Sequence, residues 1–208
     1  GRSALLPEVN PGCLPTSSQI GDLLARGVTS VLGVVDLSSP EELENLAELD
    51  QHLSLPINVG FLADLETVPG SESQSVLSRA IALGILGVVG DTESEDAKQL
   101  LDWFGIVTLA HKSLAFAPDA SVSLDDYFAD LQQDAHLARQ GDAGQIAIGS
   151  HADLVFLQSS IQHDDQQPID WRHLQRVMVS GNVVWEAGVP TAMPTGRLLV
   201  NKFRATAA

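Results

Sequence analysis

Apolar segments of strand length alternate with amphipathic, helix-like segments through the first half of the chain. Residues 28–35 form an almost continuous apolar run, and before it Thr16 or Ser17 can cap a short helix that Gly27 ends. After the run, residues 39–42 read Ser-Pro-Glu-Glu, which predicts a capping box with proline at the first helical position. Apolar strands separated by helices favour a parallel sheet with right-handed crossovers. The sequence therefore predicts an α/β protein.

The same cycle continues to about residue 110. We predict helices over residues 71–84 and 94–105, and about five strands over residues 4–9, 28–35, 56–62, 85–89 and 106–110. A further Leu- and Ala-rich helix is expected from about Ser123 to Gln140. A closed (β/α)8 barrel needs roughly 250 residues. Residues 1–140 are therefore expected to form a truncated, open or partial (β/α) barrel-like domain.

The pattern changes after residue 140. GQIAIGSHADLVFL (residues 144–157) predicts a turn, a short strand, a Gly-Ser-His turn and a buried strand. VMVSGNVVWEAG (residues 177–188) predicts a hairpin, because Ser180, Gly181 and Asn182 tolerate positive φ. Residues 141–208 are expected to form a small β-sandwich-like segment that packs onto the first domain.

These two segments resemble the C-terminal β-sandwich segment of the metal-dependent amidohydrolase superfamily, where G-x-I-x-x-G-x-x-A-D-L-V is followed by a V-x-x-x-G-x-V-V hairpin. SALLPEVNPGCLP (residues 3–15) and GVTSVLG (residues 27–33) are similar to the first strands of such enzymes, especially isoaspartyl dipeptidases and N-acyl-D-amino-acid deacylases. The resemblance implies the composite fold of that superfamily, a barrel joined to a small β segment, with the middle barrel units missing.

The resemblance also implies where a metal site should be. Aligned on Val9-Asn10-Pro11, the two metal-binding histidines of the family fall on Gly12 and Leu14, which cannot ligate a metal through their side chains. A catalytic zinc needs about three protein ligands and an open position. We expect a degenerate amidohydrolase-like protein without a metal cofactor, acting in binding or assembly. The alternative is a reduced hydrolase of amide or other C–N bonds that uses zinc or another divalent metal.

Three carboxylates are expected at the carboxyl ends of the strands. Asp36, Asp64 and Asp91 each follow a predicted strand, and parallel sheets place ligand sites at this edge. Together they are candidate ligand-binding residues. They are also the residue type that caps helices and starts loops, so a purely structural role is the competing interpretation.

His111 and Asp119 are the candidate catalytic residues of the alternative function. His111, in TLAH, resembles the strand-end histidine that binds a second metal in the superfamily, and it could act as a ligand or general base. Asp119, in FAPDA, resembles the aspartate that serves there as general base, although proline precedes it here. A hydrogen-bonded histidine and a turn aspartate are the competing interpretations.

Charge and cysteine content limit the partners. The 208 residues include 11 basic and 27 acidic side chains, a net charge of −16, which disfavours nucleic acid and anionic membranes as partners. The single cysteine, Cys13, excludes an internal disulfide and is compatible with a reducing compartment. A cytoplasmic location is expected, because the sequence shows neither an apolar run of membrane-spanning length nor a signal-like start. An open sheet exposes strand edges, so a homodimer is expected, and a small-molecule ligand remains compatible with the sequence.

Overall fold

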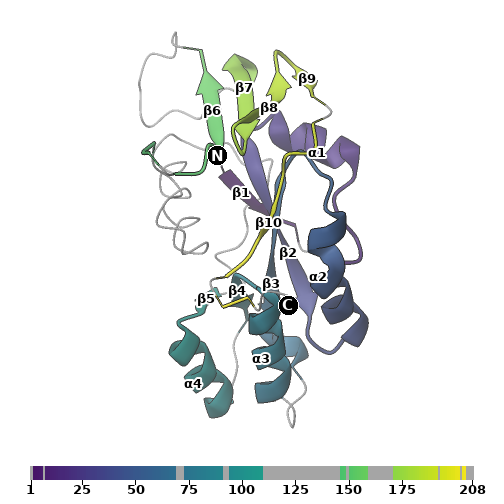
Figure 1. The fold of residues 1–208 in the computed structure, drawn as a ribbon, viewed down its shortest axis with the longest axis vertical. Helices are drawn as coiled ribbons and strands as arrows, with labels where there is room; N and C mark the ends of the chain where they lie inside the picture. Colours follow the sequence, from purple (N-terminus) through teal and green to yellow (C-terminus); the bar gives the residue numbers. More distant parts are fainter. Residues whose placement is uncertain are drawn as a thin grey trace.

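The computed structural model describes residues 2–6, 8–68, 73–90, 94–109, 146–148, 150–158, 171–191, 193–201 and 203–204. These residues form a curled parallel sheet with helices, together with a small antiparallel sheet (Figure 1). The prediction of an α/β protein with a partial, barrel-like parallel sheet and a small C-terminal β segment is confirmed at this level.

The parallel sheet follows the predicted alternation. Its first five strands lie in the order β1-β2-β3-β4-β5, so neighbours in the chain are neighbours in the sheet. Each predicted strand is present, although most are shorter than expected. The strands are β1 (Arg2–Leu5), β2 (Val28–Asp36), β3 (Asn58–Asp64), β4 (Gly87–Val89) and β5 (Val107–Leu109).

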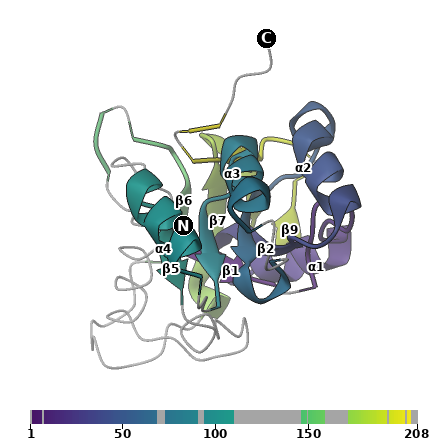
Figure 2. The ribbon, with the colours of Figure 1, turned by 90° about the horizontal axis from the view of Figure 1, so that it is seen from below.

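Residue types that favour helix caps mark both ends of α4 and the start of α1. Thr16 caps α1 and Ser94 caps α4, each accepting a hydrogen bond from a backbone N–H of the first turn. Gly105 ends α4 in the left-handed conformation, with φ of 54°. Figure 2 shows the helices along one side of the sheet. They are α1 (Ser17–Leu24), α2 (Pro40–His52), α3 (Ser73–Leu83) and α4 (Glu95–Phe104).

The capping box predicted for α2 forms only in part. The Ser39 hydroxyl accepts from the Glu42 backbone N–H at 3.3 Å, and Pro40 is the first helical residue, as predicted. The Glu42 carboxylate, however, accepts from the Asp36 backbone N–H at 2.8 Å. The complete capping box belongs to α1, where Thr16 and Gln19 bond reciprocally.

The antiparallel sheet contains the predicted hairpin. Ser180 and Gly181 have φ values of 50° and 79°, and Val179 pairs with Asn182 across them. The strands, in the order β6-β7-β8-β9, are β6 (Leu154–Leu157), β7 (Leu174–Val179), β8 (Asn182–Glu186) and β9 (Val189–Pro190).

Two details of the predicted β segment are wrong. Residues 146–148 form no strand, and the side chains of Ile146 and Ile148 are fully exposed at 92% and 108%. β6 was predicted to be buried, yet Phe156 is 39% exposed and its neighbours are half-buried. The apolar pattern of residues 146–157 therefore overstates how much of this segment is buried.

The C-terminal part of the chain returns to the parallel sheet. β10 (Leu198–Leu199) pairs in parallel with Val59 and Gly60 of β3. It lies on the same side of β3 as β4, which pairs with the later residues of that strand. With β10, the part of this sheet formed by the described residues has six strands. We call residues 193–201 the C-terminal strap, because they join the antiparallel sheet to the α/β layer (Figure 1). This return was not foreseen from the sequence.

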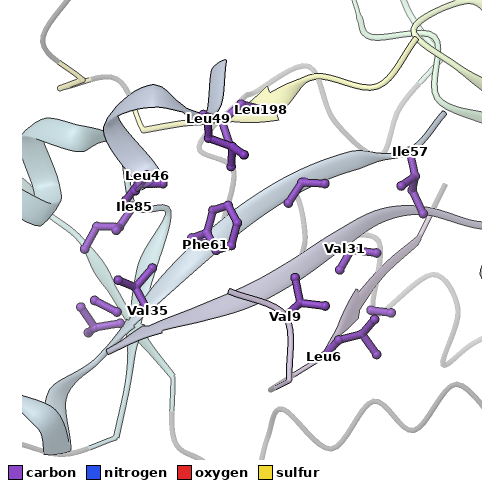
Figure 3. Close-up of a cluster of buried hydrophobic side chains, with 14 of the residues drawn as sticks. Leu6, Val9, Val31, Val35, Leu46, Leu49, Ile57, Phe61, Ile85 and Leu198 are labelled. Carbon is purple, nitrogen blue, oxygen red and sulfur yellow. The ribbon is translucent and has the colours of Figure 1, made fainter. Parts of the chain in front are cut away.

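Two hydrophobic clusters lie on opposite faces of the parallel sheet. The larger one joins the helices, one face of the strands and the inner residues of β7 and β8, so both sheets share one core. In Figure 3, Phe61 of β3 lies between Leu46 and Leu49 of α2 and Val35 of β2. The smaller cluster covers the other face and contains Leu32, Leu62, Leu86, Val89, Leu109 and Leu199.

None of the helices in the described part of the chain combines the length and the apolar character that a membrane crossing requires.

Candidate functional site

Two of the predicted carboxylates lie side by side at the carboxyl edge of the sheet. Asp36 and Asp64 are the last residues of β2 and β3, and they are direct partners in the strand register. Because side chains alternate along a strand, both share the face of the smaller hydrophobic cluster. This confirms that β2 and β3 bring these two residues together.

The carboxylate of Asp36 is engaged in a turn. One of its oxygens accepts from the Ser38 backbone N–H at 2.8 Å and from the Ser38 hydroxyl at 2.6 Å. The Ser38 hydroxyl is the main reason why the pKa of Asp36 lies below its ordinary value; burial opposes the shift, while the Ser38 backbone and the Thr67 hydroxyl add to it. The bonds hold the turn between β2 and α2.

Asp64 has a comparable local role. Its carboxylate accepts from the Glu66 backbone N–H at 2.9 Å and caps η1 (Leu65–Thr67), a single 3-10 turn. The Thr67 hydroxyl donates to the Asp64 carbonyl at 2.8 Å and accepts from the Leu37 backbone N–H at 2.9 Å. Both strand-end carboxylates therefore stabilise neighbouring turns, which matches the structural role that competes with ligand binding.

Gly12 lies in a tight turn over residues 10–13, and Leu14 directly follows this turn. Asn10 and Cys13 exchange backbone hydrogen bonds at 3.2 and 3.0 Å, and the Gly12 N–H donates to the Asn10 side chain at 3.0 Å. Leu14 packs partly buried against the core, and Cys13 is exposed. This turn follows a segment whose Val9 carbonyl accepts from Val34 of β2. It therefore has backbone and apolar contacts where the resemblance would place metal ligands.

The other predicted site residues, Asp91, His111 and Asp119, lie outside the described residues. Within the described part of the chain, no group of three or more His, Cys, Asp or Glu side chains could hold a metal ion.

A polar cluster at the opposite edge of the sheet was missed by the sequence reasoning. Asn58, at the start of β3, is completely buried, and its amide nitrogen donates to Asp153 at 2.8 Å and lies 3.5 Å from the Ser30 hydroxyl. The other Asp153 oxygen accepts from the Ser180 backbone N–H at 2.7 Å. Asp153 therefore joins the β7–β8 hairpin to the parallel sheet.

Arg197 of the C-terminal strap completes this cluster. Its backbone N–H donates to the Asn58 side-chain oxygen at 3.2 Å, and its guanidinium lies 2.8 Å from His151. Burial lowers the pKa of Arg197, and the negative charge of Asp153 opposes that shift. Two signals could have revealed the cluster: an asparagine inside a predicted buried strand, and an aspartate directly before the β6 segment.

The described site thus consists of paired, turn-forming carboxylates at one edge and a buried polar cluster at the other.

Comparisons with models of protein families, with curated proteins and with solved structures each give no match.

Proposed function

We propose that this chain is an amidohydrolase-like protein that has no metal-dependent hydrolase activity and acts in binding or assembly. The observation that carries the proposal is the turn over residues 10–13. In the proposed alignment Gly12 and Leu14 stand where the family has its histidine pair, and their surroundings are a backbone-bonded turn and the hydrophobic core. A zinc enzyme would have to draw its protein ligands from elsewhere.

The arrangement of the two sheets supports the composite architecture within this proposal. A curled parallel sheet and a small antiparallel sheet share one core, and the two segments that carry the resemblance supply β6, β8 and the second half of β7 in the antiparallel sheet. Asp153 of the A-D-L-V segment bonds to β3 and to the β7–β8 turn. This bonding is a structural reason for an aspartate at that position in a composite fold.

The proposed ligand-binding site is the carboxyl-edge rim, which is formed by the residues at the carboxyl ends of the parallel strands. Asp36 and Asp64 are neighbours there, and Asp91 belongs to the proposal by its position after the β4 segment. The alternative, a reduced hydrolase, would have to add His111, Asp119 and a divalent metal to this pair. The pairing of Asp36 with Asp64 in the strand register is the one described feature that favours it.

A hydrolysis assay separates the two functions. We expect no turnover of isoaspartyl dipeptides or N-acyl-D-amino acids above the buffer rate, with zinc, manganese or cobalt supplied. The variants His111→Ala and Asp119→Ala should behave like the parent chain, because neither side chain has a reaction to lose. Metal-dependent turnover that falls by about a hundredfold or more in His111→Ala would establish the hydrolase instead.

We further propose a homodimer in a cytoplasmic setting, formed through a strand edge. Among the described strands, β1 and β5 stand at the two ends of the strand order, and edge strands of this kind pair readily with a second chain. Light scattering at low and at high salt should give twice the chain mass of 22.1 kDa, since the contact is made by backbone groups and not by charges. A 22.1 kDa particle in both salts would contradict the dimer.

A further inference from the structure

The two described strand orders end at β1, β5, β6 and β9, and these edge strands differ in how well they resist pairing with another chain. Edge strands are usually protected by a charged side chain or a proline. In the parallel sheet, β1 begins with Arg2, and the exposed residue of β5 is the polar Thr108. In the antiparallel sheet, β9 contains Pro190, which has no N–H to donate. Each of these three strands therefore carries a residue that disfavours an apolar contact or a new strand pairing.

β6 is the edge strand without such protection. Its four residues, Leu154–Leu157, include no charged residue, proline or glycine. β7 pairs with one of its edges, and no described strand pairs with the other. Phe156, the largest residue of the strand, is 39% exposed. An apolar strand edge of this kind is a template for a further strand.

The chain directly before β6 adds apolar surface beside this edge. Ile146 and Ile148 are 92% and 108% exposed. A turn, in which the Ser150 N–H donates to the Ala147 carbonyl at 3.1 Å, then leads toward β6. Figures 1 and 2 show this green segment on the side of β6 that faces away from β7. Exposed apolar side chains therefore lie beside the uncovered edge.

The charge pattern favours a second copy of this chain as the partner at this edge. Two chains that each carry a net charge of −16 repel one another over most of their surfaces. Between Asp142 and Asp164 the only charged residue is Asp153, with histidine neutral. Both Asp153 oxygens accept hydrogen bonds from within the chain, from Asn58 and from Ser180. Two copies can therefore meet at the β6 edge without bringing free carboxylates together.

We propose that two copies of the chain pair antiparallel through β6, around a two-fold axis, so that their antiparallel sheets join into one continuous sheet. The axis passes beside Phe156, which therefore faces the Phe156 of the second copy, and cross-strand aromatic pairs of this kind stabilise a sheet. Ile146 and Ile148 extend the contact, since a ladder of four residues alone is smaller than the roughly 1,200 Å² of a stable interface. This inference rests on the homodimer proposed above and names the surface that forms it.

Charges introduced at residue 156 test this contact and its register. Phe156→Glu and Phe156→Lys should each raise the dissociation constant of the dimer about a hundredfold or more, because like charges then face each other across the axis. A mixture of the two variants should restore a dimer that contains one chain of each, which chains that had failed to fold could not form. Sedimentation velocity of the full chains at micromolar concentration measures both results.

The matched control is Val189→Glu. Val189 is 63% exposed on β9, the other edge strand of the same sheet, so this variant should dimerise like the parent chain. A mixture of the Phe156 variants that stays monomeric, or a Val189→Glu chain that dissociates as readily as Phe156→Glu, would overturn the proposal. A dimeric Phe156→Glu chain would also overturn it, while leaving the homodimer to form through another edge. A monomeric parent chain would contradict the homodimer itself, and this contact with it.

Discussion

Replacing Gly196 with alanine will destabilise the protein by about 3 kcal/mol or more, because the added methyl group has no room. A Cβ at this position would overlap the Ile57 carbonyl oxygen, and would lie 2.5 Å from the Ile57 carbonyl carbon and 2.7 Å from the Leu55 carbonyl oxygen. These are backbone atoms, which cannot turn away as a side chain can. The Gly196 N–H donates to the Leu55 carbonyl at 2.8 Å, so the strap must separate from the segment that leads into β3.

Separation of the strap would expose Leu198 and Leu199, which are now 8% exposed, and burial of a leucine is worth roughly 1.5–3 kcal/mol. Urea unfolding of Gly196→Ala measures the loss. The control is Gly21→Ala in α1, where a Cβ meets nothing within 4 Å and should stabilise the helix by about 0.5–1 kcal/mol. Equal stabilities of Gly196→Ala and the parent chain would show that the strap does not dock against β3.

Replacing Asp153 with asparagine will lower the free energy of unfolding by about 2–3 kcal/mol, although the two side chains have the same shape. Both carboxylate oxygens accept hydrogen bonds, one from the Ser180 backbone N–H and the other from the amide nitrogen of the buried Asn58. An asparagine side chain offers one acceptor oxygen and one NH2 donor group. Whichever way it turns, its NH2 group faces another donor, which leaves that donor unsatisfied.

The matched control for this variant is Asp102→Asn, at an exposed position of α4, where the same substitution should change the free energy of unfolding by less than about 0.5 kcal/mol. Both variants are compared by urea unfolding at neutral pH. If Asp153→Asn is as stable as Asp102→Asn, then Asp153 does not join the two sheets, and the structural reason given for the A-D-L-V segment is wrong.

Much of the parallel sheet could be predicted, because each of its elements leaves a local signal. The apolar run at residues 28–35 became β2 (Val28–Asp36), and Ser39-Pro40 became the start of α2. The Ser180-Gly181 turn also needs only local information, since its positive φ values restrict the residue types. The presence of these elements is decided within a few residues, so the sequence pattern predicted them, whereas it misplaced several strand ends and the complete capping box, which belongs to α1.

The features that could not be predicted depend on contacts between distant residues. β10 is only a two-residue strand, Leu198–Leu199, and it pairs with β3 because the short β4 leaves the first half of that strand edge uncovered. Ile146 and Ile148 have the alternation of a strand, yet the described residues give them no partner strand and leave them exposed. The local alternation of apolar residues does not show whether a partner strand exists.

The candidate site was predicted in position better than in chemistry. The periodicity placed Asp36 and Asp64 at one edge of the sheet, and the register confirms it. It could not decide between a ligand site and a turn, because that depends on which groups reach the carboxylates. The hydrogen bonds from Ser38 and Glu66 support the turn. The roles of Asp91, His111 and Asp119 remain predictions.

The most direct test of the central claim is the metal content of the purified full-length chain, measured by elemental mass spectrometry after exposure to zinc, iron and manganese and removal of the excess. Because Gly12 and Leu14 supply no ligand, we predict less than about 0.1 metal ion per chain, in both the parent and His111→Ala. About one zinc ion per chain, lost in His111→Ala, would contradict the account and identify the protein as a metal-dependent hydrolase with an altered site.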